Sequence, residues 1–553
     1  PTHNDPDAHP NPRKQPLRYF FCRFNHYMEE ASEFYQRYIA TYVRKPMVIL
    51  LAFAGLIIFA GFMFSRVPTG FIPQQDQGYY IIGIELPPGS SLQRTDEVIQ
   101  EVIDKLIETD GVENAVAFSG FSGATFSAAS NAGAIFPVLE SFKMREDKGI
   151  TYDSLLNSLR QKMNTIDEAF VVVIPPPPVR GIGSGGGFKM MIQDRGGVGL
   201  DALKEATFAM MGAAQERPEV TGVYSFFNTD TPQLYLDIDR VRAEKLGVPV
   251  SNIFEALEIY LGSSFVNDFN YLGRTFRVTA QADAPYRMTE EDISRIKVRN
   301  RSGGMVPLGS VTVFRDDAGP ARVPRYNLYQ SAELSGDTAA GYSSGEAIAA
   351  MEELAEQVLP EGVGFEWTEI AYQQKNAGNT AAIAFTLAVI FVFLLLSAQY
   401  ESWVLPLAVV LIVPMCLLSS ITGIAIAGMD NNILTQIGFV VLIGLACKNA
   451  ILIVEFCKQK EDEGMDMWEA AKEAGRIRLR PILMTSFAFI LGVVPLVLAS
   501  GAAAEMRQAL GVSVFSGMIG VTFFGLAFTP IFYVVVRKLA QRLRQHFMGE
   551  SAN

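Results

Sequence analysis

A lysine and an asparagine stand side by side inside a long apolar stretch of this sequence. The stretch runs from about Ile433 to Cys457 and is long enough to cross a bilayer as a helix. A lysine at that depth costs about 3 kcal/mol on insertion scales, so it normally faces a protein interior or a water-filled cavity and has an anionic partner. Lys448, with Asn449 beside it, is therefore a candidate for an ion or proton relay.

Two other roles would explain Lys448 without a relay. The side chain could reach to the membrane surface, or it could form a structural ion pair. The first role is disfavoured because Lys448 lies nine residues, or about 13 Å at helical rise, from Cys457. The second role stays open.

The composition indicates a protein with both membrane and soluble parts. Of its 553 residues, 49% are hydrophobic and 19% are charged, and the net charge of −12 argues against a nucleic-acid partner. The four cysteines show no disulfide framework and no metal-ligand spacing, and the four histidines are all terminal. Because the sequence also has no nucleophile–base pair and no phosphate loop, we expect neither an enzyme nor a metal, cofactor or ATP site.

Six apolar segments predict six membrane-spanning helices. The positive-inside rule orients them, because seven Lys/Arg precede the first span, six lie within 458–480 and four follow the last span. Both termini are then cytoplasmic, and the soluble stretch of about 300 residues lies on the other side. The predicted spans are Met47–Phe64 and, after the soluble stretch, residues 377–398, 404–427, 433–457, 482–500 and 510–536.

The residues before the first span differ in composition from the apolar segments and from the soluble stretch. Residues 1–16 are polar, as in a linker, so we expect the chain to be one piece of a longer protein. Aromatic and basic residues then recur at helical spacing over 18–45, which is typical of a helix on the membrane surface. A soluble amphipathic helix would have the same pattern. The membrane-surface helix is favoured because a membrane span follows directly.

The soluble stretch repeats a strand–helix–strand cadence, which is typical of split β-α-β modules. A strand over 79–86 precedes a helix over 95–108, and a strand over 188–192 precedes a helix over 203–215. Residues 231–318 look like an insertion. A proline run followed by a glycine-rich stretch, residues 181–187, indicates a boundary between modules and not a dinucleotide fingerprint.

Five motifs together resemble the resistance–nodulation–division (RND) transporters, in the branch of hydrophobe/amphiphile multidrug efflux pumps of Gram-negative bacteria. The resemblance runs across nearly the whole chain, but it covers only the second half of a family with twelve spans. The motifs are GFIPQQDQG at 70–78, SFVNDF at 264–269, YESW at 400–403, KNAILIVEF at 448–456 and RLRPILMTS at 478–486.

This resemblance implies a six-span α-helical membrane bundle and a periplasmic α+β region of ferredoxin-like porter subdomains with an inserted docking subdomain. The implied boundaries are a linker and surface helix at 1–45, the first span at 46–66, porter subdomains at 67–180 and at 181–230 with 319–372, the docking insertion at 231–318, five spans at 373–540 and a cytoplasmic tail at 541–553.

The resemblance also implies an inner-membrane drug/proton antiporter that confers multidrug resistance. Such pumps are homotrimers, draw on the proton gradient, and act with a periplasmic adaptor and an outer-membrane channel on hydrophobic drugs, dyes and detergents. Alternatives are a heavy-metal exporter of the same superfamily, or a membrane-anchored assembly factor without transport. Metal export would use methionines, but Met190, Met191, Met210 and Met211 fall in strand and helix patterns that predict core packing.

In the family, the lysine that matches Lys448 pairs with two aspartates of the half that is not in this sequence. Asp430 and Glu455 lie near segment ends and do not replace them. The implied proton relay consists of Lys448, Asn449, Arg478 and Thr485. Arg478 could equally anchor its helix at the membrane surface, and Thr485 could bond to its own helix backbone.

The family also binds drugs among phenylalanines beside a glycine-containing loop. The implied pocket residues are Phe118, Phe121, Phe126 and Phe136, which could equally be core. Phe121 and Phe136 occupy matching positions, Phe118 stands where many relatives have an aliphatic residue, and Phe126 is only in the same loop. Because Val116 replaces a further phenylalanine, the substrate range stays open.

Overall fold

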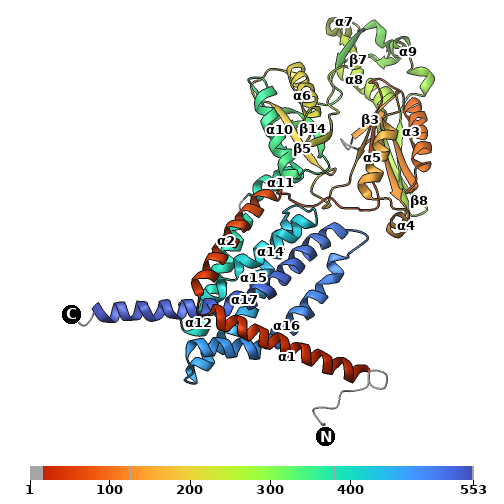
Figure 1. The fold of residues 1–553 in the computed structure, drawn as a ribbon. Helices are drawn as coiled ribbons and strands as arrows, with labels where there is room; N and C mark the ends of the chain where they lie inside the picture. Colours follow the sequence, from red (N-terminus) through yellow and green to blue (C-terminus); the bar gives the residue numbers. More distant parts are fainter. Residues whose placement is uncertain (1–15, 124–126, 379, 551–553) are drawn as a thin grey trace. The chain divides into compact units, whose positions relative to one another are not determined.

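The computed structural model of the protein describes residues 16–123, 127–378 and 380–550 (Figure 1). The chain divides into two compact units. The first unit contains the long apolar helices and two sheets, and it is formed by Pro1–Leu86, Leu92–Phe226 and Tyr326–Asn553. The second unit is formed by Pro87–Ser91 and Phe227–Arg325.

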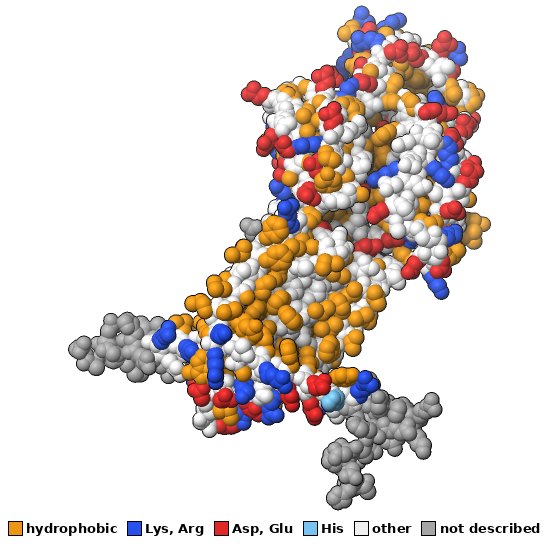
Figure 2. Space-filling model, viewed as in Figure 1, with side chains coloured by type: hydrophobic (Ala, Val, Ile, Leu, Met, Phe, Trp, Pro, Cys, Tyr) orange, Lys and Arg blue, Asp and Glu red, His pale blue; other side chains and the backbone are white. Residues whose placement is uncertain are grey.

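Six helices in the described ranges are long and apolar enough to cross a membrane, judged by length and composition. Figure 2 shows hydrophobic side chains over this helical part, with Lys and Arg at its lower end. The helices are α2 (Pro46–Arg66), α11 and α12 (Glu369–Ala377 and Thr380–Tyr400), α13 and α14 (Leu405–Val410 and Val413–Ile426), α15 (Ile433–Asp462), α16 (Met467–Val497) and α17 (Ala504–Glu550). Helix α1 (Pro16–Tyr42) precedes them.

Two details of these helices differ from the sequence-based expectation. The segment expected at 404–427 divides into α13 and α14, because Pro414 lies in the first turn of α14 and has no N–H to continue the preceding helix. The basic stretch 458–480, which lies between two of the predicted spans, is mostly helical. Only residues 463–466 separate α15 from α16, and the Asp466 side chain caps α16 by accepting from the Trp468 N–H.

Helix α17 contacts α14, α15 and α16 and has the largest buried share of the six (Figure 1). Small residues allow the close approach, as in membrane helix packing generally. A Cβ atom on Gly438 of α15 would collide with Ser513 of α17, and one on Gly520 of α17 would collide with Ser419 of α14. The Ser420 hydroxyl also donates to the Ser513 carbonyl over 2.8 Å.

The first sheet has the strand order β2-β3-β1-β4, and all neighbours are antiparallel. Alternation along β1 places Ile82 and Ile84 in the core with α3 and α5, and it places Ile81 on the opposite face. The elements are β1 (Ile81–Glu85), α3 (Leu92–Ile107), β2 (Val112–Ser122), β3 (Ser127–Leu139), α4 (Phe142–Asp147), α5 (Tyr152–Met163) and β4 (Phe170–Ile174).

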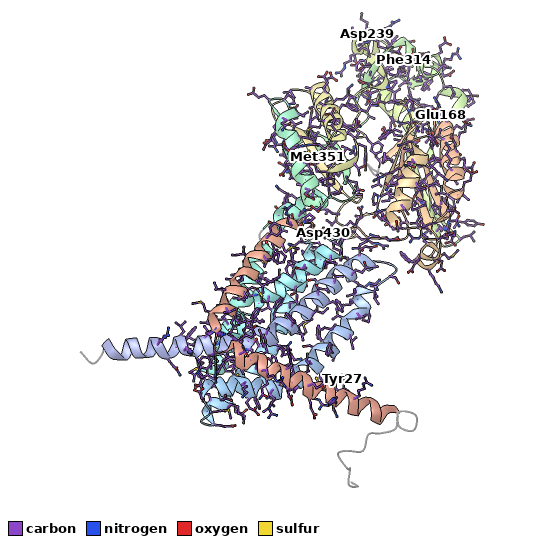
Figure 3. All side chains as sticks on the ribbon, viewed as in Figure 1. Tyr27, Glu168, Asp239, Phe314, Met351 and Asp430 are labelled. Atoms are coloured by element: carbon purple, nitrogen blue, oxygen red, sulfur yellow. The ribbon has the colours of Figure 1, made fainter. Side chains whose placement is uncertain are left out.

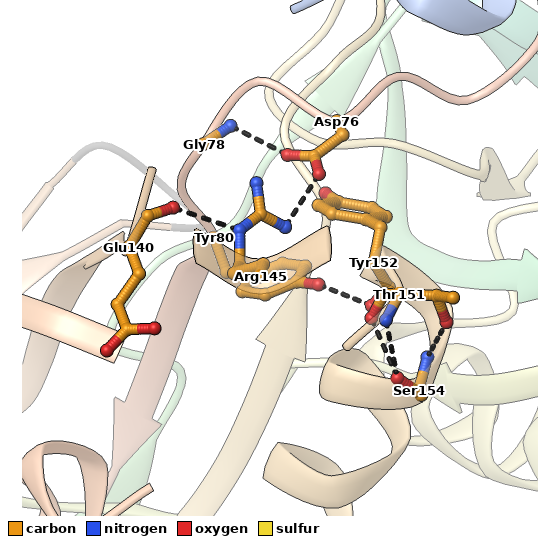
Figure 4. Close-up of polar contacts among 8 residues, drawn as sticks. All are labelled: Asp76, Gly78, Tyr80, Glu140, Arg145, Thr151, Tyr152 and Ser154. Carbon is orange, nitrogen blue, oxygen red and sulfur yellow. Dashed lines mark hydrogen bonds and ion pairs between the residues drawn. The ribbon is translucent and has the colours of Figure 1, made fainter. Parts of the chain in front are cut away.

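A buried ion pair fastens the chain segment that follows α2 to this sheet region (Figure 4). Arg145 of α4 lies 2.7 Å from Asp76, and both residues are less than one-tenth exposed. Asp76 also accepts from the Gly78 N–H over 2.9 Å, and Arg145 donates to the Glu140 carbonyl over 3.0 Å. The pair is therefore shielded from water and hydrogen-bonded on both sides.

The second sheet runs β13-β14-β5-β15, with β6 also paired to β14. Its core includes Met351 of α10, which is fully buried (Figure 3). The Ser343 and Glu346 side chains form a capping box at the start of α10. The elements are β5 (Phe188–Asp194), α6 (Leu200–Gln215), β6 (Val220–Tyr224), β13 (Arg325–Tyr326), β14 (Tyr329–Thr338), α10 (Ser344–Val358) and β15 (Val363–Thr368).

The second unit has a small core of its own, around Ala243, Ile253 and Leu308. Its described strands form three two-stranded antiparallel sheets, in which β7 pairs with β12, β8 with β9 and β10 with β11. The elements are β7 (Thr231–Ile238), α7 (Arg240–Lys245), α8 (Val250–Leu257), β8 (Ser264–Tyr271), β9 (Arg274–Ala280), α9 (Glu290–Arg295), β10 (Lys297–Arg299), β11 (Met305–Pro307) and β12 (Thr312–Gly319).

Candidate functional site

Lys448 lies on an exposed stripe of α15. Ile437, Val441, Gly444 and Lys448 follow one another at spacings of four, three and four residues, so they share one helix face, and all four are exposed. Lys448 has no ion pair or hydrogen bond with any residue that the structure describes. The sequence predicted a lysine directed at a protein interior, and in this chain its surroundings on that face are open.

The asparagine beside the lysine points the other way. Asn449 is buried, and its amide donates to the Ser486 hydroxyl of α16 over 3.1 Å. This bond satisfies a polar group that would be costly to leave unpaired in an apolar bundle. The bond also sets the register between α15 and α16. Lys448 directly precedes Asn449 and Thr485 directly precedes Ser486, so the two residues lie at the same height along the helix pair, and both are exposed.

The other two predicted relay residues lie on α16. The Thr485 hydroxyl donates to the Ile482 carbonyl of its own helix over 3.1 Å, which is the alternative role that the sequence left open. The Arg478 guanidinium lies 4.1 Å from the ring centre of Phe456 on α15. Arg478 precedes Thr485 by seven residues, so it lies about 10 Å farther along the helix pair. The structure thus arranges Arg478, Thr485 and Lys448 along one pair of helices, without direct contact.

Three of the four predicted pocket residues gather on the face of the first sheet that α3 and α5 leave open. The ring centre of Phe118 lies 6.5 Å from that of Phe121 and 5.9 Å from that of Phe136, both edge to face. Phe118 is 49% exposed, whereas Phe136 packs beside Ile81, Val172 and Ile174. Phe126 lies outside the described residues.

The register of the strands shows what else shares this open face. One row across the sheet contains Phe118, Ala134, Gly83 and Val172, so two small residues form its middle. The next row contains Ala132, Glu85 and Phe170. Phe226 reaches over the small residues, because its ring lies against Gly83 and 5.8 Å from the ring of Phe170.

Glu85 is a candidate residue that the sequence reasoning missed. The signal was present, because alternation along residues 79–86 places Glu85 on the same face as Ile81. Burial raises the pKa of the Glu85 carboxyl from its ordinary value to about 7. No hydrogen bond or ion pair joins its carboxyl to another residue in the described ranges.

We expect Glu85→Gln to stabilise the protein at pH 8 and to change little at pH 4. The raised pKa means that the folded state holds the proton more tightly, so wild-type stability is highest below the ordinary pKa and falls as pH rises to about 7. Glutamine removes this loss, which we estimate at roughly 1–3 kcal/mol for a partly exposed group.

The measurement is the thermal unfolding midpoint of the purified protein at both pH values. The matched control is Glu113→Gln, which changes an exposed glutamate on β2 of the same sheet. An equal midpoint for wild type and Glu85→Gln at pH 8 would contradict the shifted carboxyl.

A separate cavity of about 900 Å³ lies where the apolar helices meet the sheets of the first unit. Asp430 lines it (Figure 3), as does Arg66. Arg160 of α5 and Asp337 of β14 also line it and form an ion pair at 3.2 Å. Charged and apolar groups share the cavity wall, because apolar side chains line it as well, among them Phe71, Ile72 and Ile348.

A metal site in the described residues would need several ligand side chains close together. No three His, Cys, Asp or Glu side chains are grouped there as metal ligands would be. Met190, Met191 and Met210, which a metal exporter could have used, are buried in the core of the second sheet and its helix.

Comparison with known proteins identifies the family. The model of the AcrB/AcrD/AcrF family matches residues 7–537. The chain is 39% identical over 522 residues to the toluene efflux pump membrane transporter TtgB of Pseudomonas putida, covering 94% of this chain and 49% of that protein.

Two further relatives come from Escherichia coli (strain K12). The multidrug export protein AcrF is 36% identical and the multidrug resistance protein MdtF is also 36% identical; these matches cover 94% and 95% of this chain and 50% and 51% of the two proteins. The chain thus spans about half the length of the curated relatives it matches. It belongs to the AcrB/AcrD/AcrF family of RND transporters.

Proposed function

We propose that this chain is the C-terminal half of an inner-membrane drug/proton antiporter of Gram-negative bacteria, which exports hydrophobic and amphiphilic compounds. Its six apolar helices would cross the membrane, and its two sheets with their helices would be ferredoxin-like porter subdomains in the periplasm. The second unit would be the docking subdomain. The names of the relatives, which are efflux transporters for toluene, solvents and drugs, support this assignment.

The observation that carries the proposal is the uncovered position of Lys448 on α15. An ammonium group in contact with lipid at this depth would cost several kcal/mol, so a protein surface must cover the stripe. That surface must also supply an anion, because no described residue of this chain pairs with the lysine. The other half of the pump, with an aspartate pair, would meet both requirements.

A lysine held between carboxylates can couple protons to a change of conformation. Protonating a carboxylate removes the charge that holds the ammonium, which must then find another partner. The two arrangements would favour two packings of the bundle. Thr485 lies at the level of the lysine, Arg478 lies toward the cytoplasmic end, and the Asn449–Ser486 bond keeps the two helices in register. We assign the four residues to the proton relay on this basis.

The aromatic face of the first sheet is the corresponding candidate for substrate contact. Phe118, Phe121 and Phe136 meet edge to face there, and aromatic surfaces accept apolar ligands of many shapes. The complete pump would work as a homotrimer with a periplasmic adaptor and an outer-membrane channel. The proton gradient would be its energy source.

The proposal is tested by dye efflux from efflux-deficient Gram-negative cells that produce the pump containing this chain. Cells are preloaded with a hydrophobic dye, and a protonophore is added during efflux. We expect efflux to stop at once, even in cells that lack ATP synthase and keep their ATP. Efflux that continues while the gradient is absent and ATP is present would overturn proton-driven transport.

A further inference from the structure

Helix α17 contains a proline that interrupts its backbone hydrogen bonds. Pro530 has no N–H, so the carbonyl of Leu526, four residues earlier, lacks its usual donor within the helix. A carbonyl left unpaired in an apolar bundle is costly, and a neighbouring helix often supplies a donor instead. The Tyr35 hydroxyl of α1 does so, because it donates to the Leu526 carbonyl over 2.8 Å. Tyr35 thus replaces the N–H that the proline removes.

The packing of α1 supports this hydrogen bond. Helix α1 contacts α16 and α17 (Figure 1), and its side chains Tyr35, Ile39 and Val43 are buried. The spacing of four residues places the three side chains on one side of the helix. A Cβ atom on Gly475 of α16 would collide with Ile39, so the glycine permits the close approach. We call the Tyr35–Leu526 hydrogen bond, together with this packing, the α1 clamp.

A second possible donor lies directly beside the proline. Thr529 is fully buried, and its hydroxyl has no hydrogen-bond partner among the residues that the structure describes. A buried hydroxyl without a partner is costly, so its presence needs an explanation. Threonine hydroxyls in helices can donate to the carbonyl three or four residues earlier, and Leu526 lies three residues before Thr529. The carbonyl that accepts from Tyr35 is therefore also within the ordinary reach of Thr529.

We propose that the Leu526 carbonyl exchanges its donor between Tyr35 and Thr529, so that α1 clamps and releases the C-terminal part of α17. In the clamped arrangement, which the structure shows, Tyr35 donates and the Thr529 hydroxyl is unpaired. In the released arrangement, Thr529 donates within its own helix, and the Tyr35 hydroxyl turns to water as α1 moves away. The carbonyl has a donor in both arrangements, so the two can lie close in free energy and both be populated.

The part of α17 that α1 clamps is also joined to the helix that carries Lys448. Beyond the proline, the Tyr533 hydroxyl donates to the Glu461 carboxylate of α15 over 2.5 Å, and Arg537 donates to it over 2.6 Å. A movement of this part of α17 would therefore act on α15. The inference goes beyond the proposed function and does not depend on it, because the exchange of donors involves no substrate and no proton transfer.

The test is hydrogen–deuterium exchange of the purified pump that contains this chain, measured by mass spectrometry in peptides that cover α1. Tyr35→Phe keeps the ring and removes the donor, so α1 should be released more often and its amides should exchange about fivefold faster. Thr529→Val keeps the shape and removes the competing donor, so the same amides should exchange about fivefold more slowly. If Thr529 does not compete for the carbonyl, its substitution would leave the exchange of α1 unchanged.

Two further variants serve as controls. Tyr42→Phe is matched to Tyr35→Phe on the same helix, because the Tyr42 hydroxyl has no hydrogen bond with a described residue, and it should leave the exchange of α1 unchanged. Pro530→Ala restores the missing N–H of α17. In that background, neither Tyr35→Phe nor Thr529→Val should change the exchange of α1 by more than about twofold.

The opposite signs of the two single variants decide the proposal, even if Pro530→Ala does not fold. No change in Thr529→Val, or a change in the same direction in both variants, would overturn the exchange of donors. An equal effect of Tyr35→Phe with and without the proline would overturn the α1 clamp. Failure of the wild-type pump to export a dye would overturn the proposed function and leave these exchange data unaffected.

Discussion

Replacing Lys448 by alanine is expected to lower drug efflux by the complete pump about 100-fold or more, which is the size expected for loss of a group that takes part in proton transfer. The lysine is the only basic residue between Ile433 and Cys457, so no neighbour on α15 can take over its charge. The substitution also removes a charge from the membrane, so insertion should not suffer. The measurement is dye and drug efflux in cells, normalised to pump abundance in the membrane.

Lys458 provides a matched control on the same helix. It lies ten residues farther along α15, with its ammonium 6.0 Å from the ring centre of Tyr400, near the end of the apolar segment. We expect Lys458→Ala to retain most of the efflux. If Lys448→Ala transports as well as wild type, or if both variants lose transport equally, Lys448 has no special part in coupling.

Arg145→Ala is expected to destabilise the region of the first sheet by about 3–5 kcal/mol, because it leaves the Asp76 carboxylate buried without its partner (Figure 4). The substitution also removes the guanidinium from the Phe142 ring, whose centre lies 5.0 Å away. For a domain of 150–250 residues this corresponds to a fall of roughly 6–20 °C in the unfolding midpoint. The measurement is thermal unfolding of the purified protein.

The control for this prediction is Arg301→Ala. Arg301 and Glu244 have the same 2.7 Å separation as Arg145 and Asp76, but both side chains are more than half exposed. An exposed pair contributes about 0–1 kcal/mol. Similar midpoints for the two variants would show that burial of the Arg145 pair does not matter.

A double variant tests whether the loss comes from the unpaired carboxylate. Removing both charges with Asp76→Asn and Arg145→Ala together should cost less than the sum of the two single changes, since the two groups contact each other. Additive losses would show that each residue acts through other contacts.

The sequence predicted the local elements well where the pattern alone decides them. Alternation and helical spacing located β1, α3, β5 and α6 to within a few residues, and the apolar segments located the long helices. The division of α13 from α14 was missed, although Pro414 provided the signal.

Contacts between distant residues could not be read from the sequence. Asp76 and Arg145 are 69 positions apart, and only the fold of the intervening strands brings them together. Glu85 could have been placed on a strand face, but its aromatic surroundings depend on the order of four strands and on Phe226 from the next module. Residue type indicated the chemistry, and sheet order determined which residues share a surface.

Lys448 illustrates a different limit. Its type and depth predicted a polar environment, and the structure shows an open helix face instead. This chain contains the lysine of the expected ion pair but not its carboxylate partners. The geometry of that ion pair therefore does not follow from this sequence. The Asn449–Ser486 bond, by contrast, lies wholly within this chain and is formed.

The central claim is that drug export by the pump is coupled to proton movement through Lys448. The most direct measurement is proton flux in liposomes that contain the complete pump, an internal pH-sensitive dye and an imposed pH gradient. With wild type, we predict that added substrate increases proton flux in a saturable way, and that Lys448→Ala abolishes this increase. Substrate-stimulated proton flux of equal size in Lys448→Ala, or drug transport by wild type without any proton flux, would contradict the account.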